Sequence, residues 1–523
     1  MVLDTINLLL GVHILLLSIR KHSQYQESLR KSISALWLRD PERLLYFENS
    51  LTKLWLLNLD PAIPLLTPYF PQRGRPIEFE PVDILRSLIL MSDQKISGIT
   101  KWVAMLRSDK ILAALSGFLP SHTPSVGTFY DFVDRFWLES TETQAERKRK
   151  LRKPSCKPTK KLKAGEKLPP KHPKIVDKLC NYVLKGRDDF SLRAERLIQQ
   201  VFARCVVDHS VALGLIPNPS HLITAADGSS VRTGASPQGV KICDCRQKGI
   251  YNCDCKRRYG DPQATWGWDS HRKEYFYGYT LYELTAVESP HSLPLYLRFA
   301  EARRHDSVMG VVTLAEFFHV YPTLGIDKWL GDSAHDVYPF YHLLNVLDIE
   351  PFIDLNSRNQ GHYHCDPPFP VNDMGIPLCP GGHQMIFGGY QKDRNRLKWR
   401  CPLIAGSQSV KAQISCNAQC SPSPYGRTIY TKPHDDFRLF TPTPRNSEAW
   451  KLIFKLRSGC ERSFSRRKDD YKLQRCRVRS LKAWYYRAHF GAMNHHLDAW
   501  LVYYRKHGFD IWSEVLHIST KAA

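Results

Sequence analysis

The sequence lacks any apolar run of the roughly 20 residues that a helix needs to cross a bilayer. The nearest candidate, residues 8–17, is shorter, has no basic region before it and is followed by no clear small-residue cleavage site. Asp4, Asn7 and His13 interrupt it. These features favour a helix docked on the rest of the chain over a signal peptide or anchor, so we expect a soluble, cytoplasmic protein.

Acidic residues are few relative to basic ones: 51 Asp and Glu stand against 74 Lys and Arg, a net charge of +23. Such an excess favours a polyanion such as DNA or RNA, because each neutralised phosphate releases condensed counterions. A ribosome-associated or anionic-membrane protein would share it. No internal repeat is evident, and 523 residues exceed one simple core, so two or three domains are expected.

Residues 1–140 are predicted to form a helical domain. One helix begins at Pro81, a second covers residues 98–116, and a third follows Ser125 as its N-cap. Small helical domains that carry a recognition helix commonly dock on DNA. A helical domain that only packs on the rest of the chain explains the same pattern.

The composition changes abruptly over residues 141–175. Basic runs at 147–153 and 157–163 lie among Pro, Ser and Gly, with few acids and few large apolar residues. This composition predicts a flexible basic linker, which either lies along a phosphate backbone or serves only as a solvated tether.

Residues 176–355 begin with a helical segment and continue with alternating apolar elements. Strands are expected at 221–231, 275–287, 293–300, 328–332 and 349–355, with helices between the last three. Three consecutive strands followed by helix, strand, helix and strand indicate an α/β fold, a mixed sheet with helices on its faces. Residues 356–440, rich in Gly, Pro, Cys and His, read as an irregular insertion, and residues 441–523 as C-terminal helices that complete the core.

Three carboxylates stand where they could converge. Asp227 is expected to end the first strand and Asp332 the fourth, so the two would meet if these strands were neighbours. Glu461 shares one helix face with Arg457 and Lys468. Taken singly, the acids are explained as a turn residue, an N-cap and half of a surface salt bridge. Together on a basic chain they predict a divalent-metal site for nucleic-acid chemistry.

The stretch Phe454-x2-Arg457-x3-Glu461-x6-Lys468 resembles the Y-x2-R-x3-E-x6-K signature of bacterial insertion-sequence transposases of the DDE type. Phe454 keeps the aromatic ring of the usual tyrosine but lacks its hydroxyl. Shorter similar stretches lie at residues 115–118, 124–130, 226–229, 277–280, 304–307 and 331–334.

The resemblance implies a ribonuclease-H-like core in which Asp227, Asp332 and Glu461 hold two Mg²⁺ or Mn²⁺ ions, for which oxygen ligands are suited. Arg457 and Lys468 would contact phosphate. The protein would bind the terminal inverted repeats of its element, cleave a strand and join 3′-hydroxyls to target DNA, as a nucleoid-associated homodimer or larger assembly. A stand-alone metal-dependent nuclease and a non-catalytic, zinc-stabilised DNA-binding protein are the alternatives.

Cysteines gather in two groups that predict structural zinc, since an intracellular chain favours metal over disulfides. Four thiolates suit one tetrahedral Zn²⁺, and reduced, unligated cysteines are the alternative. The first group is Cys243, Cys245, Cys253 and Cys255. The second is Cys379, Cys401, Cys416 and Cys420, with His383 as a possible substitute.

A basic stretch precedes the last predicted helix. Arg475, Arg477 and Arg479 are expected to contact DNA backbone. The aromatic residues that follow, Trp484 and Tyr485 among them, are more often part of a core, although stacking on an unpaired base is the alternative.

Overall fold

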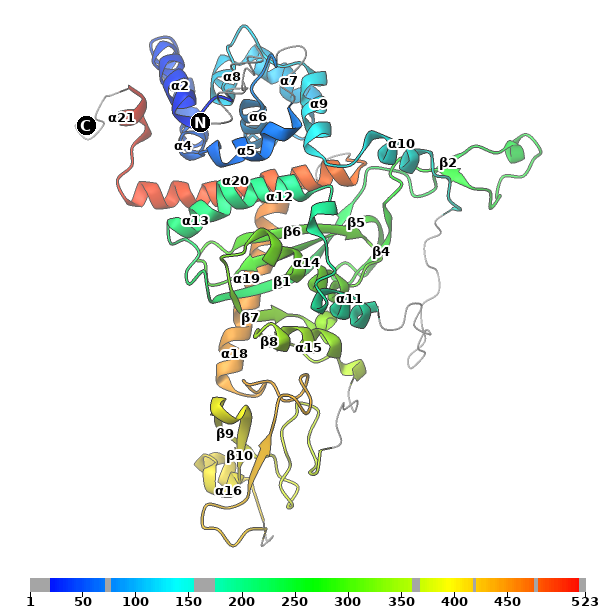
Figure 1. Cartoon of the computed structure of the whole chain (residues 1–523), viewed down its shortest axis with the longest axis vertical. Helices are drawn as coiled ribbons and strands as arrows, with labels where there is room; N and C mark the ends of the chain where they lie inside the picture. Colours follow the sequence, from blue (N-terminus) through cyan, green and yellow to red (C-terminus); the bar gives the residue numbers. More distant parts are fainter. Residues whose placement is uncertain are drawn as a thin grey trace, which may run out of the picture.

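The computed structural model describes residues 19–70, 77–154, 175–359, 367–416, 420–474 and 478–516. The helix expected around residues 8–17, most of the predicted linker, and Arg475 and Arg477 lie outside these ranges. Among the described helices, none combines the length and the apolar character that crossing a membrane requires. Figure 1 shows a helical layer at the top, a sheet in the middle, a small lobe at the bottom and an arm to one side.

The N-terminal region is helical, as expected. Its helices are α2 (His22–Trp37), α3 (Pro41–Tyr46), α4 (Glu48–Leu56), α5 (Ile63–Leu66), α6 (Pro81–Asp93), α7 (Ile99–Ser108), α8 (Lys110–Ser116) and α9 (Val126–Phe136). Pro81 opens α6, and the Ser125 hydroxyl accepts a hydrogen bond from the Thr128 amide, so both predicted helix starts are confirmed.

The single helix expected over residues 98–116 is wrong, because the chain breaks at Asp109. This residue has an extended backbone, and its carboxylate accepts hydrogen bonds from the amides of Ile111 and Leu112. An aspartate that caps the following turn satisfies amides that would otherwise lack partners, which ends α7 and starts α8.

The segment 141–175 was expected to be flexible throughout, but its first part is ordered. Helix α10 (Thr141–Arg149) begins with the Ser140 hydroxyl accepting from the Thr143 amide. Arg152 then pairs through its backbone with Arg257. Composition did not reveal this, because the helix buries no side chain and the segment after it is held by a strand residue far along the chain.

One mixed sheet forms the centre, with strand order β4-β5-β1-β7-β8 and β6 also paired with β5. Its strands are β1 (Leu222–Arg232), β4 (Thr265–Asp269), β5 (Glu274–Ala286), β6 (Leu293–Glu301), β7 (Ile326–Gly331) and β8 (Glu350–Ile353). The five predicted strands are confirmed, and β4 was not anticipated. Strand β1 is antiparallel to β5 and parallel to β7.

Helices lie on both faces of this sheet. The helices of the core are α11 (Ile175–Leu184), α12 (Arg196–Phe202), α13 (Asp208–Ala212), α14 (Asp306–Val320), α15 (Tyr338–Val346), α18 (Glu448–Phe454), α19 (Ser458–Ser465) and α20 (Leu481–Lys506), and α21 (Ile511–Leu516) packs on α2 and α4. Successive residues of β5 show the two faces: the Tyr282 hydroxyl lies beside Gly310 of α14, whereas Glu283 pairs with Arg467, just after α19. Consecutive strand residues point to opposite sides, so α14 and α19 cover opposite faces.

Helix α20 joins the N-terminal helices to the sheet, and one continuous apolar core runs through all three (Figure 1). Trp484, Tyr485 and Tyr486 at its start are buried in that core. The core interpretation of these aromatics is therefore confirmed, and base stacking by them is excluded in this structure.

The insertion at 356–440 is more regular than its composition suggested. It contains a three-stranded antiparallel sheet of β9 (Ile386–Gln391), β10 (Arg396–Arg400) and β11 (Thr428–Thr431), with short helices α16 (Pro402–Ala405) and α17 (Gln408–Ala412). A small core of its own includes Trp399, Leu397 and Met385. It forms the lower lobe in Figure 1.

Candidate active site

Two of the predicted acids lie at matching positions on adjacent strands. Ala225 of β1 is opposite Leu330 of the parallel strand β7, and Asp227 and Asp332 each follow two residues later. Register between parallel strands brings the two carboxylates side by side. Asp332 follows the end of β7, whereas Asp227 lies inside β1, which stays paired with β5 as far as Arg232, so the expectation that Asp227 ends its strand is wrong. Both acids line a cavity of about 1220 Å³, and Glu461 of α19 lines the same cavity. The expectation that the two strands are neighbours is confirmed.

Each aspartate is held by one oxygen. Asp227 Oδ1 accepts a hydrogen bond of 2.7 Å from the Gly228 amide. Asp332 Oδ1 lies 3.1 Å from the Ala334 amide, which donates to it, and 2.9 Å from His335 Nδ1. The N-cap role weighed for Asp332 is therefore present, but it occupies only Oδ1. Neither Oδ2 takes part in these hydrogen bonds, and that of Asp227 faces Arg457.

Arg457 occupies the space between two of the acids. Its guanidinium lies 2.8 Å from Glu461 Oε1 and 3.6 Å from Asp227 Oδ2. Glu461 is exposed and belongs to an i,i+4 salt bridge, the structural role weighed for it. A fully buried ion pair between Arg467, which follows α19, and Glu283 of β5 holds the end of α19 against the sheet.

Three half-buried aspartates, Asp227, Asp306 and Asp332, line the cavity. Burial raises the pKa of Asp227 to about 7, and the nearby charges of Asp332 and Asp306 contribute to the rise. Burial also raises the pKa of Asp306. At Asp332 burial acts in the same direction, but the hydrogen bond from His335 and the other favourable contacts outweigh it and hold the pKa below its usual value.

Sequence reasoning gave no role to three participants in this site. Asp306 lies in the similar stretch 304–307 but received no role, and His335 and Tyr282 were overlooked. The spacing Asp332-x2-His335 across a short turn was the available signal for the histidine. No local pattern marked Tyr282, because it comes from β5 and reaches His335 only through the folded sheet.

The remaining signature residues are packed around the acids. Phe454, at the position of the usual tyrosine, stacks on Trp450 with ring centroids 4.4 Å apart. The Lys468 ammonium contacts the Ser229 hydroxyl and lies 6.0 Å from the Phe464 ring. The ring of Phe454 thus serves packing, for which a hydroxyl is not required.

A family model described as "Transposase DDE domain" matches residues 218–493, which are 276 of the 523 residues. The chain belongs to the DDE transposase family. The matched range contains both aspartates, Glu461, the Cys-rich insertion and the first half of α20. No match was found among curated proteins or among solved structures. Family membership identifies the chain as a DDE-type insertion-sequence transposase.

DDE transposases use divalent metal ions, and the chemistry of this cavity fits such ions. Carboxylate oxygens are the ligands that Mg²⁺ and Mn²⁺ prefer. A divalent cation would relieve the repulsion that contributes to the raised pKa of Asp227. The three carboxylates are not all within 4.8 Å of one another in the described structure.

In this transposase the four sulfur atoms of the first cysteine group lie close together. The sulfurs of Cys243, Cys245, Cys253 and Cys255 all lie within 4.8 Å of one another. Two of the separations are 3.5 Å, between Cys243 and Cys253, and 3.6 Å, between Cys245 and Cys255. Zinc–sulfur bonds of about 2.3 Å in a tetrahedron place sulfurs about 3.8 Å apart, so the cluster is compatible with zinc.

The second group is not gathered in the same way. Among the described residues, only the first group brings three or more ligand atoms so close together. Cys379, His383 and Cys416 surround Gly381, whereas Cys401 lies beside Gly426. The predicted tetrad with Cys401 and Cys420 is therefore not assembled in this structure.

The structure describes three of the five residues that were predicted to contact DNA. Arg457 and Lys468 line the cavity beside the acids. Arg479 is exposed just before α20, while Arg475 and Arg477 lie outside the described residues.

Proposed function

We propose that this transposase cleaves a DNA strand at each end of its element and joins the exposed 3′-hydroxyls to target DNA. The observation that carries the proposal is the convergence of Asp227, Asp332 and Glu461 on one cavity, from two adjacent parallel strands and a helix. The net charge of +23 supports binding to DNA. By family resemblance, it binds the terminal inverted repeats and works as a homodimer or larger assembly.

We also propose that the catalytic core has the ribonuclease-H-like fold. The strand order β6-β5-β1-β7-β8, with β1 antiparallel to β5 and parallel to β7 and β8, supports this assignment. In this proposal residues 176–355 and 441–523 form the core, residues 1–140 dock on DNA, and residues 356–440 are an insertion.

The side chains have distinct roles in the proposed mechanism. Oδ2 of Asp227, Oδ2 of Asp332 and the Glu461 carboxylate would hold the metal ions. When bound, two Mg²⁺ or Mn²⁺ ions would activate the attacking water or 3′-hydroxyl and stabilise the leaving oxygen. Arg457, released from Glu461, would bind a phosphate with its two-pronged guanidinium. The Lys468 ammonium would neutralise a phosphate of the same DNA strand.

A cleavage and joining assay tests the proposal. Labelled duplexes that carry the element's own ends, incubated with Mg²⁺, are expected to yield nicked products and then branched or longer joined products. Chelation should abolish both. Nicked products without joining would identify a metal-dependent nuclease, and specific end binding without nicking would identify a non-catalytic DNA-binding protein.

A further inference from the structure

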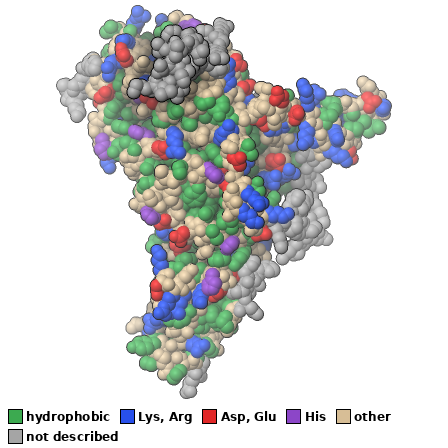
Figure 2. Space-filling model, viewed as in Figure 1, with side chains coloured by type: hydrophobic (Ala, Val, Ile, Leu, Met, Phe, Trp, Pro, Cys, Tyr) green, Lys and Arg blue, Asp and Glu red, His purple; other side chains and the backbone are tan. Residues whose placement is uncertain are grey.

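A basic arm, defined as residues 147–153 together with residues 240–258, projects from the side of the molecule. It leaves the sheet between the end of β1 and the start of β4 and includes the strands β2 (Val240–Lys241) and β3 (Arg257–Arg258). Figure 1 shows it beside α10, away from the helical layer and the lower lobe. Figure 2 shows Lys and Arg side chains along the same projection.

The arm is built into the fold rather than tethered to it. Backbone hydrogen bonds of 3.2 and 2.8 Å join Arg152 to Arg257. The Arg152 guanidinium donates to the Ala264 carbonyl at 3.2 Å and to the Tyr277 hydroxyl at 2.6 Å. It also lies 4.0 Å from the centroid of the Tyr259 ring. These contacts fix two segments, distant in sequence, to β5, and the four-cysteine cluster closes the outer hairpin.

The charge of the arm is one-sided. Its residues include twelve Lys and Arg but only two acids, Asp244 and Asp254. Eight of the basic residues are exposed: Lys148, Arg149, Lys150, Lys153, Arg246, Lys248, Lys256 and Arg258. Only Lys248 forms an ion pair with a described acid, Asp244 at 2.7 Å. Like charges held together on a rigid surface favour an anionic partner.

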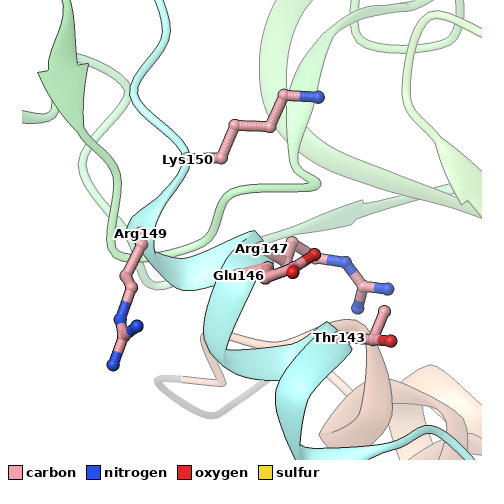
Figure 3. A pocket seen from close by; sticks show the side chains of 5 residues that line it. All are labelled: Thr143, Glu146, Arg147, Arg149 and Lys150. Carbon is pink, nitrogen blue, oxygen red and sulfur yellow. The ribbon is translucent and has the colours of Figure 1, made fainter.

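A cavity lies at the base of the arm. A cavity of about 560 Å³ is lined by Thr143, Glu146, Arg147, Arg149 and Lys150. Figure 3 shows Arg149 and Lys150 extending from the end of α10 in different directions, away from the neighbouring Glu146 and Arg147. Arg147 pairs with Glu139, so Arg149 and Lys150 are the cations available to a ligand here.

We propose that the basic arm binds the phosphate backbone of duplex DNA that continues outward from the active-site cavity. Asp227 and Arg232, the last residue of β1, are five residues apart, which is about 17 Å of strand. At roughly 3.4 Å per base pair, the arm meets the duplex about five or more base pairs from the cleaved bond. Lys and Arg side chains are frequent donors to phosphate oxygens, which position a protein on the duplex. The inference rests on the proposed function for its ligand.

Charge reversal in the outer hairpin tests the arm. The triple variant Arg246→Glu, Lys256→Glu and Arg258→Glu leaves the cysteines in place. Binding is measured with Ca²⁺ in place of Mg²⁺, so that the result does not depend on cleavage. For a duplex of about 30 base pairs centred on the cleavage site, affinity is expected to fall at least tenfold. The slope of log affinity against log salt should decrease by about 3, close to one for each phosphate that the variant no longer neutralises.

Two controls define the result. A duplex that ends three base pairs beyond the cleavage site should bind the variant and the wild type equally. The matched variant Lys185→Glu, Arg187→Glu and Lys506→Glu, with three exposed residues outside the arm, should keep the affinity for the long duplex. Unchanged binding of the long duplex by the arm variant would overturn the proposal, even if cleavage is confirmed. Loss of self-association without DNA, at unchanged DNA affinity, would instead identify the arm as a protein interface.

A second inference concerns His335, which is fully buried behind Asp332. Its Nδ1 lies 2.9 Å from Asp332 Oδ1, and its Nε2 lies 2.6 Å from the Tyr282 hydroxyl. The glycines around the ring leave no spare room. A Cβ added at Gly331 would lie 3.0 Å from Nδ1, and one added at Gly310 would lie 3.2 Å from the Tyr282 hydroxyl. The ring is therefore held in one orientation.

We infer that His335 is a positioning residue that turns Oδ2 of Asp332 toward the metal site. A carboxylate only accepts hydrogen bonds, so Nδ1–H of His335 donates to Oδ1 of Asp332, while Nε2 is within hydrogen-bond distance of the Tyr282 hydroxyl. Histidine and tyrosine thus link β5 to the end of β7 across β1. This inference also rests on the proposed function, which assigns the metal to Asp332.

Two substitutions distinguish the loss of the hydrogen bond to Asp332 from the change in side-chain size. In His335→Asn the amide nitrogen replaces Nδ1 and retains the donor to Asp332, whereas in His335→Gln it replaces Nε2 and that donor is lost. Mn²⁺ affinity, measured by electron paramagnetic resonance without DNA, is expected to fall about tenfold or more in the glutamine variant. The asparagine variant should stay within about threefold of the wild type.

Equal losses in the two variants would indicate a merely structural role and overturn the inference, as would unchanged affinity in the glutamine variant. Thermal unfolding of both variants checks that each is folded. Wild-type protein that binds Mn²⁺ but does not cut DNA would refute the proposed function while leaving the role of His335 open to the same comparison.

Discussion

Replacing Asp227, Asp332 or Glu461 by alanine is expected to reduce Mg²⁺-dependent cleavage by at least about 100-fold, a typical loss when one group that stabilises a transition state is removed. Each change removes a proposed metal ligand, while the exposed basic surface that binds DNA is unchanged. Binding of end DNA should therefore stay within about threefold of the wild type. The measurements are single-turnover cleavage of labelled ends and, in parallel, DNA affinity in Ca²⁺.

Asp469→Ala is the matched control for the triad. This exposed acid lines the same cavity, but it accepts its hydrogen bond from Ser465 rather than from a residue of the triad. The variant should retain nearly full cleavage. Full activity in any of the three triad variants would remove that residue from the proposed site. An equal loss in Asp469→Ala would show that the effect arises from cavity charge in general.

The double variant Cys243→Ser and Cys253→Ser is expected to lose one equivalent of bound zinc and the order of the outer hairpin. The side chains of Val240, Ile250 and Tyr251 are exposed, so the hairpin has little core of its own. Zinc in such small sites contributes about 10 to 16 kcal/mol to folding. Trypsin should cleave residues 240–258 at least tenfold faster than in the wild type, because a protease needs a locally unfolded backbone around its target residues and the opened hairpin provides one.

The cysteines of the insertion provide the comparison for this experiment. Cys401→Ser with Cys420→Ser should leave the zinc content and the trypsin pattern of the hairpin unchanged, since that tetrad is not assembled in the structure. Metal analysis of purified protein and mass spectrometry of the fragments give both readings. Zinc retained in full by Cys243→Ser with Cys253→Ser would contradict the assignment of the first cluster.

Local patterns in the sequence were sufficient for much of the fold. The apolar run before Asp227 forms a strand, and Pro81 and Ser125 start helices. Each depends on neighbours within a few turns of the chain. Glu461 lies on a helix as expected, but the helix expected from Phe454 to Lys468 is interrupted by a 3-10 turn at residues 455–457 and changes to a π-helix at residues 466–470. The break at Asp109 was not predicted, because a good capping residue inside a helical pattern does not say whether it will be used.

The sequence by itself determined the identity of the acids, their order along the chain and the two strands that position Asp227 and Asp332, although it placed the end of the first strand at Asp227, five residues too early. Only the tertiary structure decided what lies between and behind them. Arg457 reaches Asp227 across two elements, and Tyr282 reaches His335 from another strand. The pairing of Arg152 with Arg257, which makes the arm rigid, joins segments more than a hundred residues apart. Such contacts depend on the packing of strands and helices, and no local spacing in the sequence encodes them.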